Sequence, residues 1–321
     1  MHYDAFNGDA DGISSLVQLR LTHPIDSVLV TGAKRDIRLV ERVAASAGDR
    51  VTVLDVSLAA NRAPLERLIA RGAIVEYFDH HYAGDDPLPA QLIAHIDTSP
   101  GVCTGMLVDR FLAGRQRIWA VVAAFGDNLI DQAFELASSL PMLGGTLDAL
   151  KDLGDCLTYN SYSDRIEDAL VRPDELARTL IRCADPLRFV ATDSAYAAID
   201  EARRRDLALA RQARPADVLP GALVYVLPDA PWTRRVRGIF SNEIANARPR
   251  LAHAVLTMRD DGAYEVSVRA PRDRPIGADT LCRGFGNGGG RAAAAGIDRL
   301  PPAQYREFVE RLGRAYPSGE P

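Results

Sequence analysis

The sequence has very little lysine and no paired cysteines. Lys34 and Lys151 are its two lysines beside 36 arginines, a bias that we attribute mainly to the source genome, so the arginine count alone indicates little. The four cysteines are scattered without a CxxC pair: Cys103, Cys156, Cys183 and Cys282. This spacing argues against a disulfide framework or a zinc site, and it predicts reduced, buried thiols in a cytoplasmic protein.

Other signals are missing as well. No run of about 18 apolar residues occurs, which predicts no membrane span. The first residues, MHYDAFNGD, lack the basic and then apolar pattern of a signal peptide. No GxxxxGK[ST] motif occurs, so a P-loop enzyme is not supported. The GFGNGGG stretch near the C-terminus leaves no room for the βαβ unit of a dinucleotide-binding loop.

Charge is modest and uneven. The formal net charge is −5, of which residues 215–321 carry +3 and the first 214 residues carry −8. A slightly basic C-terminal part suits a ligand that bears phosphate. A protein that coats long duplex DNA needs a far stronger basic field, so we expect no such partner.

The order of predicted elements indicates two α/β domains. In the first 130 residues, short apolar strands alternate with helical segments, which predicts a parallel sheet with helices on both faces. We place a first domain at 1–190 and a polar linker helix at 191–214. Residues 215–321 form a smaller mixed α/β domain in this prediction, with a cleft between the two domains. Residues 135–185 read as helical without an assignable role.

Acidic and imidazole side chains follow several of these predicted segments. Each one alone has an ordinary explanation as a turn, a loop cap or a helix end. Together they would meet at the carboxyl edge of the sheet, where ligands bind. They are Asp9 and Asp11 in FNGDADG, Asp55 in VTVLD, the run Asp79, His80 and His81 in VEYFDHH, and Asp127 in AVVAAFGD. Such donors suit Mn²⁺, Mg²⁺ or Fe²⁺. Two ions roughly 3.5–4 Å apart would clamp a phosphoryl group, with Asp55 as the bridging ligand.

The ordered set NGDADG, VLD, FDHH and FGD resembles the motifs of the DHH phosphoesterase superfamily, which includes RecJ-type exonucleases, nano-RNases and cyclic-dinucleotide phosphodiesterases. EVSVRAP and GFGNGGGRAAAAG are similar to the DHH-associated C-terminal domain. The resemblance spans roughly residues 3–190 and 215–300. It implies a hydrolase that acts on phosphate esters with two divalent cations, Mn²⁺ favoured and Mg²⁺ the alternative.

The resemblance also implies a role for each matched residue. Asn7 and Asp9 would bind the first metal, while Asp11, His80 and Asp127 would bind the second. Asp79 would orient His80 through its second ring nitrogen, and His81 would face the substrate phosphate as a hydrogen-bond or proton donor. In the C-terminal domain the substrate would be held by Arg269, Gly288, Gly289, Gly290 and Arg291.

Three residues depart from the family pattern. Asn7 stands where many members have His and some have Asp, Arg291 stands where they usually have His, and Asn287 stands where they often have Gly. A short oligonucleotide or nucleotide is the favoured substrate, a cyclic dinucleotide is the next choice, and pyrophosphate is less favoured. The alternative from another class is a non-catalytic nucleotide-binding or regulatory module. For Lys34, in TGAKRD, a solvated loop is the default expectation, although the residue follows a predicted strand and could reach the substrate from the rim of the sheet. Cys103 is expected to open a helix, although GVCTG could also suggest a nucleophile.

Overall fold

The structure, a computed structural model, describes residues 1–34, 36–141, 144–162 and 166–317. The chain divides into two compact units, Met1–Glu201 and Ala202–Pro321, and the division falls within helix α9 (Ser194–Ala210). The linker role predicted for this helix stays a prediction. None of the helices in the described part of the chain is long and apolar enough to cross a membrane.

The first unit is built on a parallel sheet, as predicted. Its strand order is β2 (Val28–Gly32), β1 (His2–Asn7), β3 (Arg50–Leu54), β4 (Ile74–Asp79) and β5 (Ile93–Ile96). Its helices are α1 (Ala10–Thr22), α2 (Leu58–Ala70), α3 (Thr104–Phe111), α4 (Arg117–Gly126), α5 (Ile130–Ala137), α6 (Thr146–Ser161), α7 (Pro173–Cys183) and α8 (Pro186–Thr192). Two single turns, η1 (Leu39–Arg42) and η2 (Ile166–Asp168), complete the unit.

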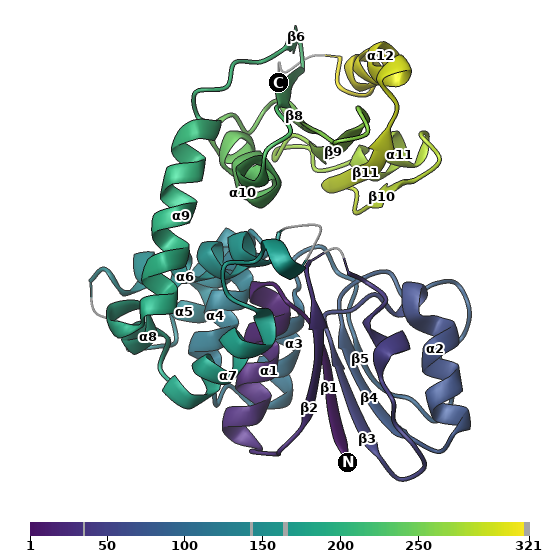
Figure 1. The fold of residues 1–321 in the computed structure, drawn as a ribbon, viewed down its shortest axis with the longest axis vertical. Helices are drawn as coiled ribbons and strands as arrows, with labels where there is room; N and C mark the ends of the chain where they lie inside the picture. The colour runs from purple at the N-terminus through teal and green to yellow at the C-terminus, as the bar shows by residue number, and fades with distance from the viewer. Residues whose placement is uncertain (35, 142–143, 163–165, 318–321) are drawn as a thin grey trace. The chain divides into compact units, whose positions relative to one another are not determined.

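Helices cover both faces of this sheet, which confirms the predicted layers. Helix α2 lies on one side of the strands, and α1 and α3 lie on the other (Figure 1). Successive strand residues point to opposite faces, so each strand needs apolar residues throughout. Ala5 and Val53 pack in the cluster with α2, and Phe6 and Leu54 are completely buried too.

The second unit is the smaller mixed α/β domain that the sequence predicts. Its sheet has the order β10 (Gly288–Gly290), β11 (Ala294–Leu300), β9 (Tyr264–Arg269), β8 (Ala252–Met258), β7 (Ala222–Leu227) and β6 (Asp217–Leu219). Strands β7 and β8 pair in parallel across helix α10 (Pro231–Ala247), and the other pairs are antiparallel. The parallel pair requires such a crossover.

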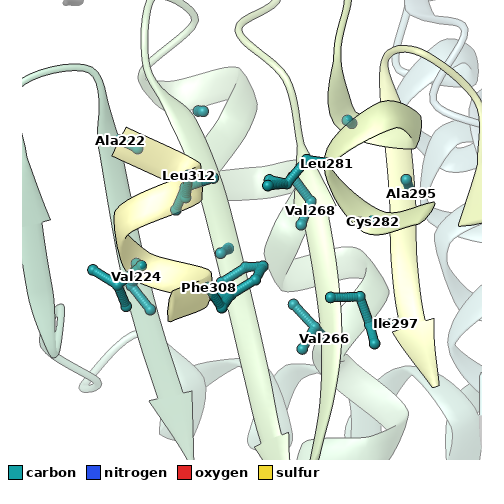
Figure 2. Packing of buried hydrophobic residues seen from close by; sticks show 14 of the residues in the cluster. Ala222, Val224, Val266, Val268, Leu281, Cys282, Ala295, Ile297, Phe308 and Leu312 are labelled. Atoms are coloured by element: carbon teal, nitrogen blue, oxygen red, sulfur yellow. The ribbon is translucent and has the colours of Figure 1, made fainter. Parts of the chain in front are cut away.

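The core of the second unit lies between this sheet and the last helices. Helix α11 (Ala278–Arg283) and helix α12 (Tyr305–Ala315), which follows the turn η3 (Pro302–Gln304), pack on the strands. Figure 2 shows Phe308 and Leu312 of α12 against Val224, Val266 and Val268 of the sheet. Helices α10 and α11 were not individually predicted from the sequence.

A buried ion pair fixes the start of β1. Asp4 is completely buried and accepts hydrogen bonds from Arg20 Nε at 2.8 Å and Arg20 Nη2 at 2.7 Å. Ser27 Oγ donates to the same carboxylate at 2.6 Å. Burial raises the pKa of Asp4, but hydrogen bonds from His2, Arg20 and Ser27 outweigh it and hold the pKa at about 2 instead of 3.8.

We therefore expect Asp4→Asn to destabilise the protein in a pH-dependent way. The lowered pKa of Asp4 corresponds to about 2 kcal/mol of stability. This contribution is complete above the unfolded pKa of 3.8 and is lost as the pH falls through about 2. Urea unfolding at pH 7 should show that the free energy of unfolding falls by about 2 kcal/mol or more, because Arg20 is left buried without its carboxylate partner. The exposed Asp26→Asn should unfold like the wild type, and an equal loss at pH 7 and pH 2 would contradict the assignment to Asp4.

Candidate active site

The candidate site lies where the strand order of the first sheet reverses. From β1 the chain adds β2 on one side and then returns to add β3 on the other. In open parallel sheets, ligands bind outside the carboxyl ends of the strands at such a reversal. Asn7 is the last residue of β1, Asp9 follows that strand, and Asp55 directly follows β3. The sequence pattern therefore places these residues at the position where this fold type binds ligands.

Asp55 adopts a left-handed backbone conformation. Its φ is 57°, and its side chain is only 2% exposed. Non-glycine residues rarely adopt this region, and they do so mainly where the surrounding structure forces the chain into it. Asp and Asn are the side chains that tolerate it best. The conformation turns the chain at the end of β3, and the carboxylate accepts a hydrogen bond from Thr104 Oγ1 at 3.3 Å.

Asp11 is held by the first backbone amides of α3. Thr104 N–H donates to Asp11 Oδ2 at 2.8 Å, and Gly105 N–H donates to Asp11 Oδ1 at 2.7 Å. A Cβ at Gly105 would lie 2.4 Å from Ala123 Cβ, so glycine is required for this close approach. In the sequence, the GVCTG segment drew attention only because it contains Cys103. Its contribution to the site comes instead from the amides at the start of the helix.

The His80 ring approaches both buried carboxylates. His80 Nε2 lies 3.3 Å from Asp55 Oδ1 and 3.8 Å from Asp11 Oδ2. Asp55, His80 and His81 also offer ligand atoms that all lie within 4.8 Å of one another. Carboxylate oxygens and an imidazole nitrogen at this spacing fit one divalent cation.

The electrostatics of the group favour a cation. Burial raises the pKa of Asp11 well above its ordinary value, and the charge of Asp55 raises it further. Burial likewise raises the pKa of Asp55, and the charge of Asp9 adds to the effect. Two neighbouring buried carboxylates repel each other, so a bound positive charge stabilises both. Asp127, half-buried at the end of α4, adds to the negative charge around Asp11 and Asp55.

The two histidines have different partners from those predicted. Asp79 was expected to orient His80, but its Oδ1 lies 2.7 Å from His81 Nδ1 and accepts the His81 backbone N–H at 3.2 Å. His80 Nδ1 instead lies 2.7 Å from the carbonyl oxygen of Val102. Burial lowers the pKa of His81, but the hydrogen bond and charge of Asp79 outweigh it, so the pKa is raised overall.

The first predicted metal position contains a lysine. Lys34 Nζ forms an ion pair with Asp9 Oδ2, so the expected solvated loop is wrong for this residue. Burial raises the pKa of Asp9, but the charge of Lys34 lowers it below its ordinary value. Arg35 of the same segment lies outside the described residues. That Asn7 and Asp9 bind a first cation stays a prediction, and the structure adds Lys34 to this position.

The predicted substrate residues of the second unit lie on or next to the two strands that flank β11. Arg269 ends β9, and its Nε donates to Asn242 Oδ1 of α10 at 2.8 Å. The stretch Gly288–Gly290 forms the edge strand β10, and it is separated from β9 only by β11. Arg291 follows this strand and is exposed. Asn242 was missed, because nothing in the sequence links α10 to the end of β9.

Cys103 has the structural role that was expected for it. It is completely buried as the N-cap residue of α3. Burial raises the pKa of its thiol well above 9.0. A thiol must ionise to act as a nucleophile, so Cys103 is not a candidate for catalysis.

Two solved structures share this architecture. A DHH-domain protein, described as a member of a family of ribosomal proteins, matches with a TM-score of 0.65 and 14% identity, over 98% of this chain and 85% of its own. This chain has the DHH superfamily fold. The pGpG-specific phosphodiesterase PggH from Vibrio cholerae matches with a TM-score of 0.58 and 14% identity, over 98% of both chains. No family model and no curated protein sequence matches the chain.

The Asp79–His81 contact of this DHH fold predicts a measurable titration. We expect Asp79→Asn to lower the pKa of His81 in the metal-free protein, because the neutral amide no longer stabilises the protonated ring. NMR of the histidine ring protons as a function of pH measures the change. Glu76→Gln is the matched control, because Glu76 Oε1 lies 3.1 Å from His95 Nε2. This change should leave the pKa of His81 unaltered. A pKa of His81 that is the same in the wild type and in the Asp79→Asn variant would contradict the pairing.

Proposed function

We propose that this chain is a metal-dependent hydrolase of phosphate esters in short oligonucleotides or nucleotides. The observation that carries the proposal is the convergence of Asp11, Asp55 and His80 at the strand reversal of a DHH fold. These residues would hold a divalent cation, for which Mn²⁺ is favoured over Mg²⁺. Such an ion would polarise the phosphate and generate hydroxide from bound water near neutral pH. The resemblance predicts two ions, of which these three residues fit one.

His81 would supply the proton that the reaction needs. Attack by hydroxide on phosphorus breaks the bond to the ester oxygen, and that oxygen must gain a proton as it leaves. Asp79 holds His81 Nδ1 and raises the pKa of the ring, which leaves Nε2 as the atom that donates a proton. The role of Asp79 is then to position His81 and to keep it protonated.

The substrate class is supported by three observations. The PggH structure, similar in fold, is described as a phosphodiesterase specific for pGpG. The net charge of −5 does not suit long duplex DNA. In the second unit, Arg269 and the glycines of β10 combine a planar cation with backbone that a phosphate can approach closely. We propose that they bind the part of the nucleotide that does not react, together with Arg291.

A non-catalytic nucleotide-binding module is the second candidate. Asn7 and the Lys34–Asp9 ion pair favour it, because both reduce the ligands available to a first cation. A cyclic-dinucleotide phosphodiesterase differs from the main proposal only in its substrate. All three functions can be compared in one assay.

Turnover of 5′-phosphorylated di- to pentanucleotides and of cyclic dinucleotides with Mn²⁺ tests the proposal. Asp55→Ala and His80→Ala should each lower kcat/KM by on the order of 100-fold or more, because each removes a ligand to the cation that stabilises the transition state. Asp131→Ala removes an exposed carboxylate of α5 and should have no effect. Binding of these nucleotides without turnover under all conditions would favour the module instead.

Arg269 provides a test of the second unit. We expect Arg269→Gln to raise KM roughly tenfold or more with a smaller change in kcat, because a charge-assisted hydrogen bond to a non-reacting phosphate is lost. Steady-state kinetics on a dinucleotide separates the two constants. Arg306→Gln, which changes an exposed arginine of α12, is the control. A pure loss of kcat would contradict a binding role for Arg269.

A further inference from the structure

Lys34 is held in place by its backbone as well as by its charge. Its N–H donates to the Ser161 carbonyl at 2.8 Å, and its own carbonyl accepts from Asn7 Nδ2 at 3.4 Å. Its Nζ lies 5.7 Å from the centre of the Tyr162 ring. A Cβ at Gly8 would lie 2.1 Å from the Gly32 carbonyl oxygen, so the chain after β1 and the end of β2 can approach only with glycine there. This close approach sets Lys34 beside the residues that follow β1.

The oxygens at the first predicted metal position already have partners in the protein. Asp9 Oδ1 accepts the Asp11 and Gly12 N–H groups, both at 3.1 Å, and so caps α1. Asp9 Oδ2 pairs with Lys34, and Asn7 Oδ1 accepts the Asp9 N–H at 3.3 Å. The Lys34 and Asp9 side chains are 27% and 4% exposed, so the ion pair is largely shielded from water. A divalent ion on the same carboxylate would be repelled by the ammonium at close range.

The second predicted metal position differs in its fixed charge, although Asp11 accepts backbone hydrogen bonds there too, from Thr104 and Gly105. Asp11 and Asp55 approach His80, an imidazole that binds a metal in its neutral form. The two predicted metal positions therefore differ in fixed charge. The first contains the ammonium of Lys34, and the second contains ligands for a divalent ion.

We propose that the ammonium of Lys34 takes the place of the first divalent cation, so that the site binds one divalent ion, at Asp11, Asp55 and His80. This inference rests on the proposed function and replaces the prediction of two ions. Lys34 neutralises Asp9 and can donate a hydrogen bond to a phosphate oxygen. An ammonium does not acidify a bound water as a metal ion does, so any hydroxide must form at the second position. Asn7 is consistent with this arrangement, since a neutral amide suffices where no metal needs a charged ligand.

Metal stoichiometry tests the inference without any turnover. Metal-free protein is titrated with Mn²⁺, free Mn²⁺ is followed by electron paramagnetic resonance, and bound Mn²⁺ is counted by elemental analysis after dialysis. The wild type should bind one Mn²⁺ per chain. Asn7→His with Lys34→Ala should bind two, and the two ions should give an exchange-coupled signal because they would lie within about 4 Å of each other. Lys34→Met, which removes the charge but keeps an unbranched chain, should bind a second, weaker ion.

The chain offers a matched control in its other lysine. Lys151 pairs with Asp155 on α6, and Lys151→Ala should bind one Mn²⁺ like the wild type. Asp55→Ala should lose the single ion of the wild type. Thermal unfolding followed by circular dichroism selects the variants that remain folded.

The outcomes separate this inference from the proposed function. Two Mn²⁺ ions bound to the wild type would overturn the inference and leave the hydrolase proposal standing. Folded Lys34 variants that bind only one Mn²⁺ ion, like the wild type, would also overturn the inference. One ion bound to the wild type and two to the double variant, without hydrolysis of any nucleotide, would support the inference and reject the hydrolase. A wild type that binds no Mn²⁺ would overturn both.

Discussion

The site depends on the burial of two carboxylates beside each other at the carboxyl end of a parallel sheet. Asp11 and Asp55 are 1% and 2% exposed, and nearby negative charge raises the pKa of both. The amides of Thr104 and Gly105 at the start of α3 place hydrogen bonds and the positive end of a helix on Asp11. These contacts fix the geometry, but burial and repulsion still outweigh them. A positive charge nearby therefore stabilises the two ionised carboxylates. The surrounding residues determine which group supplies that charge.

Positive charge enters this region in three forms. Lys34 is a permanent cation beside Asp9, His81 becomes a cation when protonated, and Asp11, Asp55 and His80 can bind a metal ion. The three forms suit fixed neutralisation, proton donation and activation of water, respectively. In this proposal the roles are divided among residues that follow β2, β3 and β4 and Asp11 in the first turn of α1. A chain with the same sheet could redistribute them by changing only loop residues.

The positions of the site residues could be predicted because parallel strands share one functional edge. The strands before Asp55 and Asp79 are mostly apolar, so the point where each strand ends could be seen in the sequence. Asp127 instead follows the apolar helix α4. Their contacts could not be predicted in the same way. Asp79 is adjacent to His80 in sequence, yet it pairs with His81, because the choice depends on side-chain rotamers at the strand end.

Other elements were missed because tertiary packing overrides their sequence pattern. Helix α10 has a charged sequence, PWTRRVRGIF, and its Arg237 is fully buried against Glu265 of β9 with Nη2 2.6 Å from Oε1. Arginine is usually a surface residue, so the sequence of a helix that buries an arginine does not show an obvious buried face. Lys34 was assigned to a solvated loop for the same reason. In both cases the partner carboxylate lies far away in the sequence.

The left-handed backbone of Asp55 has a consequence for how this protein changes over time. Glycine at this position would relax the chain at the end of β3, while it would remove the carboxylate that the site needs. Stability and chemistry therefore favour different residues at position 55, as is common where a site stores strain. A descendant released from selection for the reaction would gain stability by losing the aspartate. Aspartate at this position in a related chain would then indicate that the proposed activity is kept. Glycine would indicate that it has been lost.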